Sequence, residues 1–403
     1  MTRTPALRSL RAALALLLLA ACIEIKDEDA PASKTSAQPN APSTATPVSE
    51  TAPDTADISA PSYALSALDT AGLAQQLPPE LADSATKTSR ISSADAPLTK
   101  FPAKILGRGP VPLQLQILLD RSNFSPGIVD GTWGSNAAKA LAFFASSDAA
   151  AADTSSMSKQ RSTIDRATYD RLRAAAGSEP ALRKYTITES DLSGPFVKIP
   201  DSVYQQAKLP CLCYSTAAEA IAERFHTTQK LLAQLNPGIT LDNLRAGAVL
   251  TVPNVDNERQ ASATDSIPIA RLIVSRTGFW THAVDASGRI LFHFPSTLGA
   301  GYDPSPSGDF KIVSVAHNPK FHYQPKLFAE VPDTKPEARL PAGPNSPVGV
   351  VWIGLSKPHY GIHGTSAPET IGYANSHGCV RLTNWDAQQL SDLVESGTPV
   401  VFR

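Results

Sequence analysis

The chain has 403 residues, enough for about two to four domains of ordinary size. Its 36 basic and 37 acidic residues nearly cancel, so no net charge would attract nucleic acid or an acidic lipid surface. The 34 prolines are a high number, and we expect many of them in linkers and turns.

The first 22 residues have the pattern of an export signal. A basic start with Arg3, Arg8 and Arg11 precedes an apolar run at 12–21 that is too short to cross a bilayer as a helix. The run ends in Leu-Ala-Ala-Cys at 19–22, which resembles a bacterial lipobox. This resemblance favours lipidation of Cys22 and a periplasmic protein anchored to the outer membrane. Cleavage by an ordinary signal peptidase, leaving no anchor, is the alternative.

Residues 23–105 are rich in Ala, Pro, Ser, Thr and Asp and show little apolar periodicity. Such a composition buries too little apolar surface to fold, so we expect a disordered tether between the lipid and the folded domains. A spacer without any specific role is the alternative.

A helical module is predicted over residues 106–178. Apolar residues recur at helical spacing in 111–119 and 137–144, and a third helix is expected at 166–175. Between the first two helices the chain is rich in turn residues, including Asp130, Gly131 and Gly134. This pattern resembles the peptidoglycan-binding-like three-helix domain, although the glycines are also typical of a tight loop.

Residues 184–254 resemble a LysM domain with an insertion. A strand at 185–187, helices at 216–225 and 228–235 and a closing strand within 244–253 are expected, with Thr216 and Thr228 as helix N-caps. LysM domains bind glycans that contain N-acetylglucosamine. The insertion between the first strand and the first helix departs from the family, so a spacer role stays open.

Two cysteines, Cys211 and Cys213, lie inside this insertion. An exported protein favours disulfides, but cysteines this close in sequence are poorly placed to bridge each other. We therefore expect two small apolar residues without an assigned function.

Residues 267–403 alternate β-branched runs with turns. Strands are expected at 269–275, 278–285, 290–295, 310–315, 348–353 and 398–402, and one helix at 386–395. The pattern predicts a β-rich domain with one main helix, which agrees with the sandwich-like fold implied by the resemblance described below. The whole chain is thus a multidomain protein in which small α and α+β modules precede this domain.

A short polar segment, 362–382, carries the most chemistry. It contains two histidines, a cysteine and glycines that allow tight turns. A thiol is a strong nucleophile only as thiolate, and a neighbouring imidazole takes its proton. Glycine turns bring backbone N–H groups close to a reacting carbonyl. The segment therefore predicts an acyl-transfer site with a cysteine nucleophile.

This segment resembles the signature of the YkuD-type L,D-transpeptidase catalytic domain. It has His-Gly-Thr at 363–365, Ser-His-Gly-Cys at 376–379 and then Arg381, and further similar segments lie upstream at 297–299, 304–310, 341–349 and 352–355. The resemblance covers 267–403 and implies a compact β-sandwich. It also implies a thioester chemistry without a cofactor.

The resemblance implies the following roles. Cys379 is the nucleophile, and His363 is the general base, with its second ring nitrogen held by a backbone carbonyl, that of Gly364. His377 lines the site and positions the cysteine or the substrate. The backbone N–H groups of Gly378 and Cys379 form the oxyanion hole.

A second set of residues is expected to contact the substrate or shape the site: Arg381, Ser376, Gly364, Trp352 and Tyr360. Arg381 either fixes a carboxylate or braces the catalytic loop. Ser376 is expected to form hydrogen bonds within that loop. Trp352 and Tyr360 are expected in the groove wall.

Other uses of these side chains are less consistent with the motif. His359, His363, His377 and Cys379 would together suit zinc, but the motif does not call for a metal, so we expect none. A buried structural thiol at Cys379 is disfavoured by the polar, glycine-rich surroundings. Outside the motif, histidines are expected in strands (His282 and His293) and in a Pro-rich stretch that would cover the groove (His317 and His322).

The implied substrates are peptidoglycan stem peptides. Acyl transfer from a stem tetrapeptide to a second stem makes a 3–3 cross-link, and transfer to a lysine of an outer-membrane lipoprotein attaches that protein to the wall. Water as acceptor makes the enzyme a carboxypeptidase or another hydrolase. An inactive wall-binding scaffold is the remaining alternative.

Overall fold

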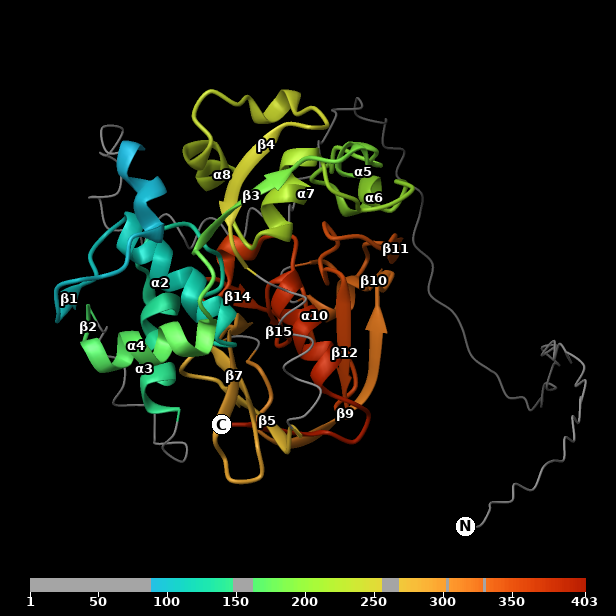
Figure 1. Ribbon diagram of the computed structural model, residues 1–403. Helices are drawn as coiled ribbons and strands as arrows, with labels where there is room; N and C mark the ends of the chain where they lie inside the picture. Colours follow the sequence, from blue (N-terminus) through green and yellow to red (C-terminus); the bar gives the residue numbers. More distant parts are fainter. Residues whose placement is uncertain (1–87, 148–161, 256–267, 302–303, 329–330) are drawn as a thin grey trace, which may run out of the picture. The chain divides into compact units, whose positions relative to one another are not determined.

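The computed structural model describes residues 88–147, 162–255, 268–301, 304–328 and 331–403 (Figure 1). All of them belong to one compact unit of the chain. The predicted export signal, Cys22 and most of the predicted tether lie outside these ranges. Among the described residues, no helix has the length and apolar character needed to cross a membrane.

The predicted tether is wrong for residues 88–105. This part contains a 3₁₀ helix, η2 (Thr88–Asp95), and a short strand, β1 (Ala103–Lys104). The side chains of Ile91, Ala94 and Ile105 are buried in two hydrophobic cores. These few apolar residues suffice for folding because the modules that follow provide the surface they pack on.

Three helices form the helical module: α2 (Pro110–Arg121), α3 (Ser135–Ser146) and α4 (Arg166–Ala176). A strand β2 (Thr163–Ile164) pairs with β1. Helix α2 is buried along most of its length and serves two cores. Its Leu115 and Leu118 pack in the core of α3 and α4, whereas Leu113 and Ile117 pack in the core of the next module.

In the next module, β3 (Leu182–Thr186) pairs antiparallel with β4 (Val249–Pro253). Between these strands in sequence lie the helices α7 (Ala217–Arg224) and α8 (Gln229–Leu235) and the short η4 (Leu241–Asn243). The hydroxyls of Thr216 and Thr228 accept hydrogen bonds from N–H groups in the first turns of α7 and α8. Both predicted N-caps are therefore present. The insertion between β3 and α7 carries two short helices, α5 (Glu189–Leu192) and α6 (Val203–Gln206).

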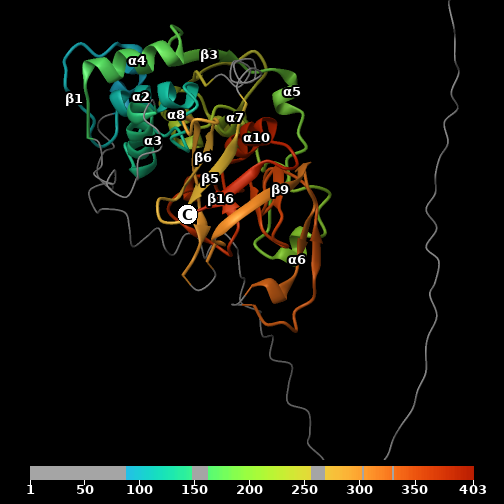
Figure 2. The same ribbon diagram turned by 90° about the horizontal axis from the view of Figure 1, so that it is seen from below.

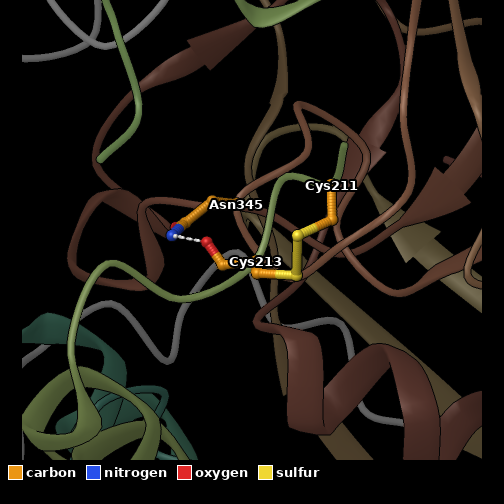
Figure 3. The surroundings of a disulfide bond; sticks show 3 residues. All are labelled: Cys211, Cys213 and Asn345. Atoms are coloured by element: carbon orange, nitrogen blue, oxygen red, sulfur yellow. Dashed lines mark hydrogen bonds between the residues drawn. A yellow bond between two sulfur atoms is a disulfide. The ribbon is translucent and has the colours of Figure 1, made fainter. Parts of the chain in front are cut away.

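Cys211 and Cys213 form a disulfide inside this insertion, so the expectation that they do not bridge is wrong (Figure 3). Their Cα atoms are 5.2 Å apart, within the normal range for a disulfide. The residue between them, Leu212, forms backbone hydrogen bonds with Ala342 and Asn345 of the C-terminal domain. The bridged loop thus docks on that domain.

The C-terminal domain is built on an eight-stranded sheet, which confirms the predicted β-rich class. Its strand order is β15-β13-β12-β9-β16-β5-β6-β7. The strands are β5 (Arg271–Ser275), β6 (Trp280–Val284), β7 (Ile290–Pro295), β9 (Gly308–His317), β12 (Val351–Leu355), β13 (Gly361–His363), β15 (Val380–Arg381) and β16 (Pro399–Phe402). The main helix, α10 (Asn384–Leu393), packs against β12 and β13 (Figure 1).

Strands β5, β6 and β7 are buried on both faces. Leu272 and Val274 of β5 pack in the core beneath α10, whereas Ile273 and the Trp280 ring pack with the helical module. Figure 2 shows this module beside β5 and β6. His282 and His293 lie in strands as predicted, and their side chains are completely buried between the two layers.

The remaining elements surround the site. A hairpin of β10 (Phe321–Tyr323) and β11 (Ala338–Leu340) follows β9 and carries η5 (Pro325–Leu327). Strand β8 (Leu298–Gly299) pairs in parallel with β14 (Asn375–Ser376), and η6 (Pro368–Thr370) precedes β14. The β10–β11 hairpin and the insertion share a small hydrophobic core, to which the insertion contributes Leu212.

Candidate active site

The two motif segments lie side by side as neighbouring strands. β13 pairs in parallel with β15, with Ile362 opposite Val380 and His363 opposite Arg381. Ile362 and Val380 are completely buried in the core. Because side chains alternate along a strand, Arg381 lies on the other face with His363, and Cys379 lies in the bend directly before β15. The register therefore brings His363 and Arg381 to one face of the sheet, beside the turn that carries Cys379.

The His363 imidazole is buried and held in one orientation. Its Nδ1 lies 2.7 Å from the carbonyl oxygen of Gly364. A carbonyl only accepts hydrogen bonds, so Nδ1 carries the proton and Nε2 keeps its lone pair. Burial, and then the positive charge of Arg381, lowers the pKa of His363 to about 3, although the bond to Gly364 acts in the opposite direction. The ring is therefore neutral at pH 7, and Nε2 is unprotonated.

The cysteine lies directly before β15 and is half-buried. Its Sγ–H donates to the carbonyl oxygen of His359 at 3.6 Å. The preceding Gly378 has φ +91°, and a Cβ there would collide with the Tyr360 ring. Only glycine fits this turn, which sets the direction of the Cys379 backbone N–H. The Tyr360 ring thus lies against the turn that carries Cys379.

Two further motif residues have distinct surroundings. The His377 ring meets the Phe328 ring edge to face, with centroids 4.9 Å apart. Phe328 follows η5 in the Pro-rich stretch that was expected to cover the groove, so this stretch does contact the site. Ser376 is buried, and its hydroxyl donates to the Cys379 carbonyl at 2.5 Å. This bond supports a role in bracing the loop more than a contact with substrate.

Arg381 is tied to a second strand by its backbone. Its N–H donates to the Thr297 carbonyl and its carbonyl accepts from the Thr297 N–H, each at 2.9 Å. Its charge acts on the buried His363. The positive charge of Arg381 therefore lowers the basicity of the imidazole.

Trp352 lies opposite His363 on β12, and the two rings stack with centroids 5.4 Å apart. The half-buried indole is thus a wall of the histidine site. Among the described residues, no group of three or more His, Cys, Asp or Glu side chains is arranged to hold a metal ion.

Three residues near the site were missed by the sequence interpretation: Asn384, Glu223 and Phe328. Asn384 follows the motif directly, at the start of α10, and its Oδ1 accepts from the N–H of Thr365 at 3.1 Å. Glu223 belongs to α7 and binds the Asn384 amide at 2.9 Å. The position of Asn384 right after the motif was a usable signal, whereas no sequence pattern singles out Glu223.

The arrangement combines a half-buried thiol, a neutral imidazole with a fixed tautomer, a glycine turn and a guanidinium. These are the parts that acyl transfer through a cysteine requires. The structure brings His363 and Arg381 together on one face of the sheet, next to the turn that carries Cys379, with Trp352, Tyr360 and His377 around them.

Comparison with known proteins identifies the family of the C-terminal domain. The model of the L,D-transpeptidase catalytic domain (YkuD) matches residues 270–402, and the LysM model matches residues 218–253. A Bacillus licheniformis protein whose name describes it as an L,D-transpeptidase, YkuD, is 33% identical over 182 residues, which are 45% of this chain and 90% of that protein. Its Bacillus subtilis counterpart is 29% identical, over 45% of this chain and 91% of its own length.

Solved L,D-transpeptidase structures are more distant. The one from Xylanimonas cellulosilytica is 15% identical, with a TM-score of 0.32, over 76% of this chain and 100% of that chain. The one from Mycobacterium smegmatis is 20% identical, with a TM-score of 0.28, over 33% of this chain and 57% of that chain. On the match to the Bacillus relatives and to the domain models, the chain belongs to the YkuD family of L,D-transpeptidases and carries a LysM domain ahead of its catalytic domain.

Proposed function

We propose that this chain is a peptidoglycan L,D-transpeptidase that transfers an acyl group through Cys379. The observation that carries the proposal is the register of β13 with β15, which supports the presence of His363 and Arg381 on one face, directly beside the turn that carries Cys379. The single tautomer set by Gly364 adds to it, because it leaves His363 Nε2 as a base.

In the first step, the Cys379 sulfur attacks the carbonyl carbon between the third, diamino residue of a stem tetrapeptide and its terminal D-Ala. His363 Nε2 takes the thiol proton and passes it to the leaving amine, so D-Ala departs and a thioester remains. The low pKa of His363 disfavours a stable thiolate–imidazolium pair before the attack, so we expect proton transfer to accompany the attack. The N–H groups of Gly378 and Cys379 stabilise the oxyanion.

In the second step an amine attacks the thioester and its proton returns through His363 to the sulfur. The side chain of another stem as acceptor gives a 3–3 cross-link, and a lysine of an outer-membrane lipoprotein gives a wall-attached protein. Arg381 fixes a carboxylate of a stem peptide, and Trp352 and Tyr360 form walls of the groove. No cofactor takes part in these steps.

The surroundings of the reaction are proposed as well. Lipidation at Cys22 would anchor the protein to the outer membrane, with the catalytic domain in the periplasm. The helical module of α2, α3 and α4 is proposed as a peptidoglycan-binding-like domain, and the LysM domain as a contact to wall glycan. Each of these elements keeps the enzyme near its substrate.

The test uses the full chain in detergent with disaccharide-tetrapeptide muropeptides, beside Cys379→Ala. Mass spectrometry of the products should give a dimer that lacks one D-Ala, formed only when Cys379 is present. Tripeptide monomer alone would favour the hydrolase alternative or a missing protein acceptor. Unchanged tetrapeptide would favour the inactive scaffold, and turnover by Cys379→Ala would refute the assignment of the nucleophile.

A further inference from the structure

A buried asparagine holds the loop that follows the catalytic histidine. Asn384 is the first residue of α10, and its Oδ1 accepts hydrogen bonds from the N–H groups of Val350 at 3.2 Å and Thr365 at 3.1 Å. A Cβ on Gly364 or on Gly349 would collide with this oxygen. The amide is thus in close contact with the Gly364 peptide, whose carbonyl accepts the hydrogen bond of the His363 ring.

The orientation of this amide is decided from its other side. A side-chain amide places its oxygen correctly only if acceptors face its nitrogen. Asn384 Nδ2 donates to the Pro344 carbonyl at 3.1 Å and to Glu223 Oε1 at 2.9 Å. The carboxylate comes from α7 in the LysM domain, so a second domain takes part in ordering the catalytic loop.

Glu223 is itself held in place. The Tyr214 hydroxyl donates to the same Oε1 at 3.0 Å. Burial raises the pKa of Glu223 to about 7, although hydrogen bonds from Asn384 and Tyr214 lower it. A carboxylate that is largely withdrawn from water destabilises a fold unless its hydrogen bonds compensate, and here the bond to Asn384 joins the LysM domain to the catalytic domain.

We propose that Glu223 is a positioning residue for acyl transfer: it fixes the Asn384 amide, which in turn fixes the Gly364 peptide and the orientation of the His363 ring. The inference rests on the proposed function, because it assigns a base role to His363. It also gives the LysM domain a role within the catalytic unit, besides any contact with glycan.

A neighbouring contact separates this role from general docking of the two domains. One turn earlier on α7, Glu219 Oε1 accepts from the Asn345 amide at 2.9 Å. The Asn345 amide also donates to the Cys213 carbonyl (Figure 3). This second carboxylate therefore joins the same two domains, but its partner is not bonded to Thr365 or Val350. Glu219 is the matched control for Glu223.

The experiment compares Glu223→Gln, Glu223→Asp, Glu223→Ala and Glu219→Ala in the full chain in detergent. One readout is D-Ala release from disaccharide-tetrapeptide muropeptides, with kcat and KM determined separately. The other is the ring tautomer of His363, read from nitrogen NMR shifts of ¹⁵N-histidine protein, assigned with a His363→Gln sample. The NMR readout needs no turnover, so it tests the inference even if the proposed reaction fails.

The glutamine reaches Asn384 without a charge, whereas the aspartate keeps the charge but is one methylene short. We expect Glu223→Gln to match wild type and Glu223→Asp and Glu223→Ala to lose roughly tenfold or more in kcat at little changed KM. The tautomer signal of His363 should broaden or shift in these two variants only. The aspartate keeps the inference testable if the alanine variant does not fold.

Three results would overturn the inference. An active Glu223→Asp beside an inactive Glu223→Gln would show that charge matters rather than reach. An equal kcat loss in Glu219→Ala would reduce the effect to domain docking. An unchanged His363 tautomer in Glu223→Asp would show that the ring does not depend on this contact.

Discussion

His363 and Trp352 face each other across β13 and β12, and their rings lie nearly parallel, with an interplanar angle of 17° and centroids 5.4 Å apart. The indole limits tilting of the imidazole, while the hydrogen bond to Gly364 limits its rotation within the ring plane. Two different contacts thus restrict one side chain, which is the condition for a well-directed general base.

Replacing Trp352 by alanine should release the imidazole. Aromatic pairs contribute about 0.5–1.5 kcal/mol beyond their buried area, so we expect a lower melting temperature and roughly tenfold slower D-Ala release. Trp352→Phe retains an aromatic face and should stay close to wild type in both measurements. Wild-type turnover in Trp352→Ala would show that the stacking contact does not position the base.

The acylation rate should not fall between pH 8 and pH 5 through protonation of His363. Its pKa of about 3 keeps the ring neutral over this window, because burial opposes the charged form. Single-turnover release of D-Ala measures this step without the titration of an acceptor amine. An acid limb with an apparent pKa near the usual histidine value would contradict the burial argument, provided that the substrate itself does not titrate there.

Glu223→Gln should stabilise the protein more at pH 8 than at pH 5. The folded-state pKa of Glu223 is raised to about 7, so the wild type loses stability as pH rises from the unfolded-state pKa toward 7. Wild type loses at most about 3 kcal/mol of unfolding free energy in this way, and the glutamine variant, which does not titrate, does not. The charged or titratable groups around Glu223 are Tyr214, Glu219 and His226.

Urea unfolding of wild type and Glu223→Gln at both pH values measures this difference. Glu189→Gln, which replaces an exposed carboxylate on α5, is the control. An equal pH-dependent gain in the control, or none in Glu223→Gln, would refute the argument from burial.

Gly343→Ala should loosen the docking of the disulfide loop. Gly343 has φ +148°, and a Cβ there would collide with the backbone of Leu212. Because the atoms in the way are backbone, the loop must move, and we expect a loss of about 1–3 kcal/mol in unfolding free energy. Hydrogen exchange in the β10–β11 hairpin should rise, since this hairpin shares a core with Leu212.

Gly301→Ala is the matched control, because a Cβ at Gly301 meets nothing within 4 Å. Equal exchange in the hairpin of both variants would separate the hairpin from the disulfide loop.

Much of the fold could be predicted where apolar residues recur at a regular spacing. The helices expected at 111–119 and 137–144 are α2 and α3, with one or two more residues at each end. The predicted end of the tether was wrong because Ile91, Ala94 and Ile105 are too few to form a recognisable pattern. The prediction that Cys211 and Cys213 do not bridge was wrong because closeness in sequence was taken to forbid a disulfide. The local backbone in fact separates their Cα atoms by 5.2 Å, which a disulfide can span.

The sequence by itself determined the reactive groups, since Cys379, His363 and the glycine turn lie within one short segment whose chemistry is local. Only the tertiary structure decided how these groups are held. The His363 tautomer depends on the Gly364 carbonyl, and the Gly364 peptide depends on Asn384 and, through it, on Glu223, which is 161 residues away in the chain. A contact between such distant segments arises from the packing of two domains, and residue order alone does not encode it as a pattern.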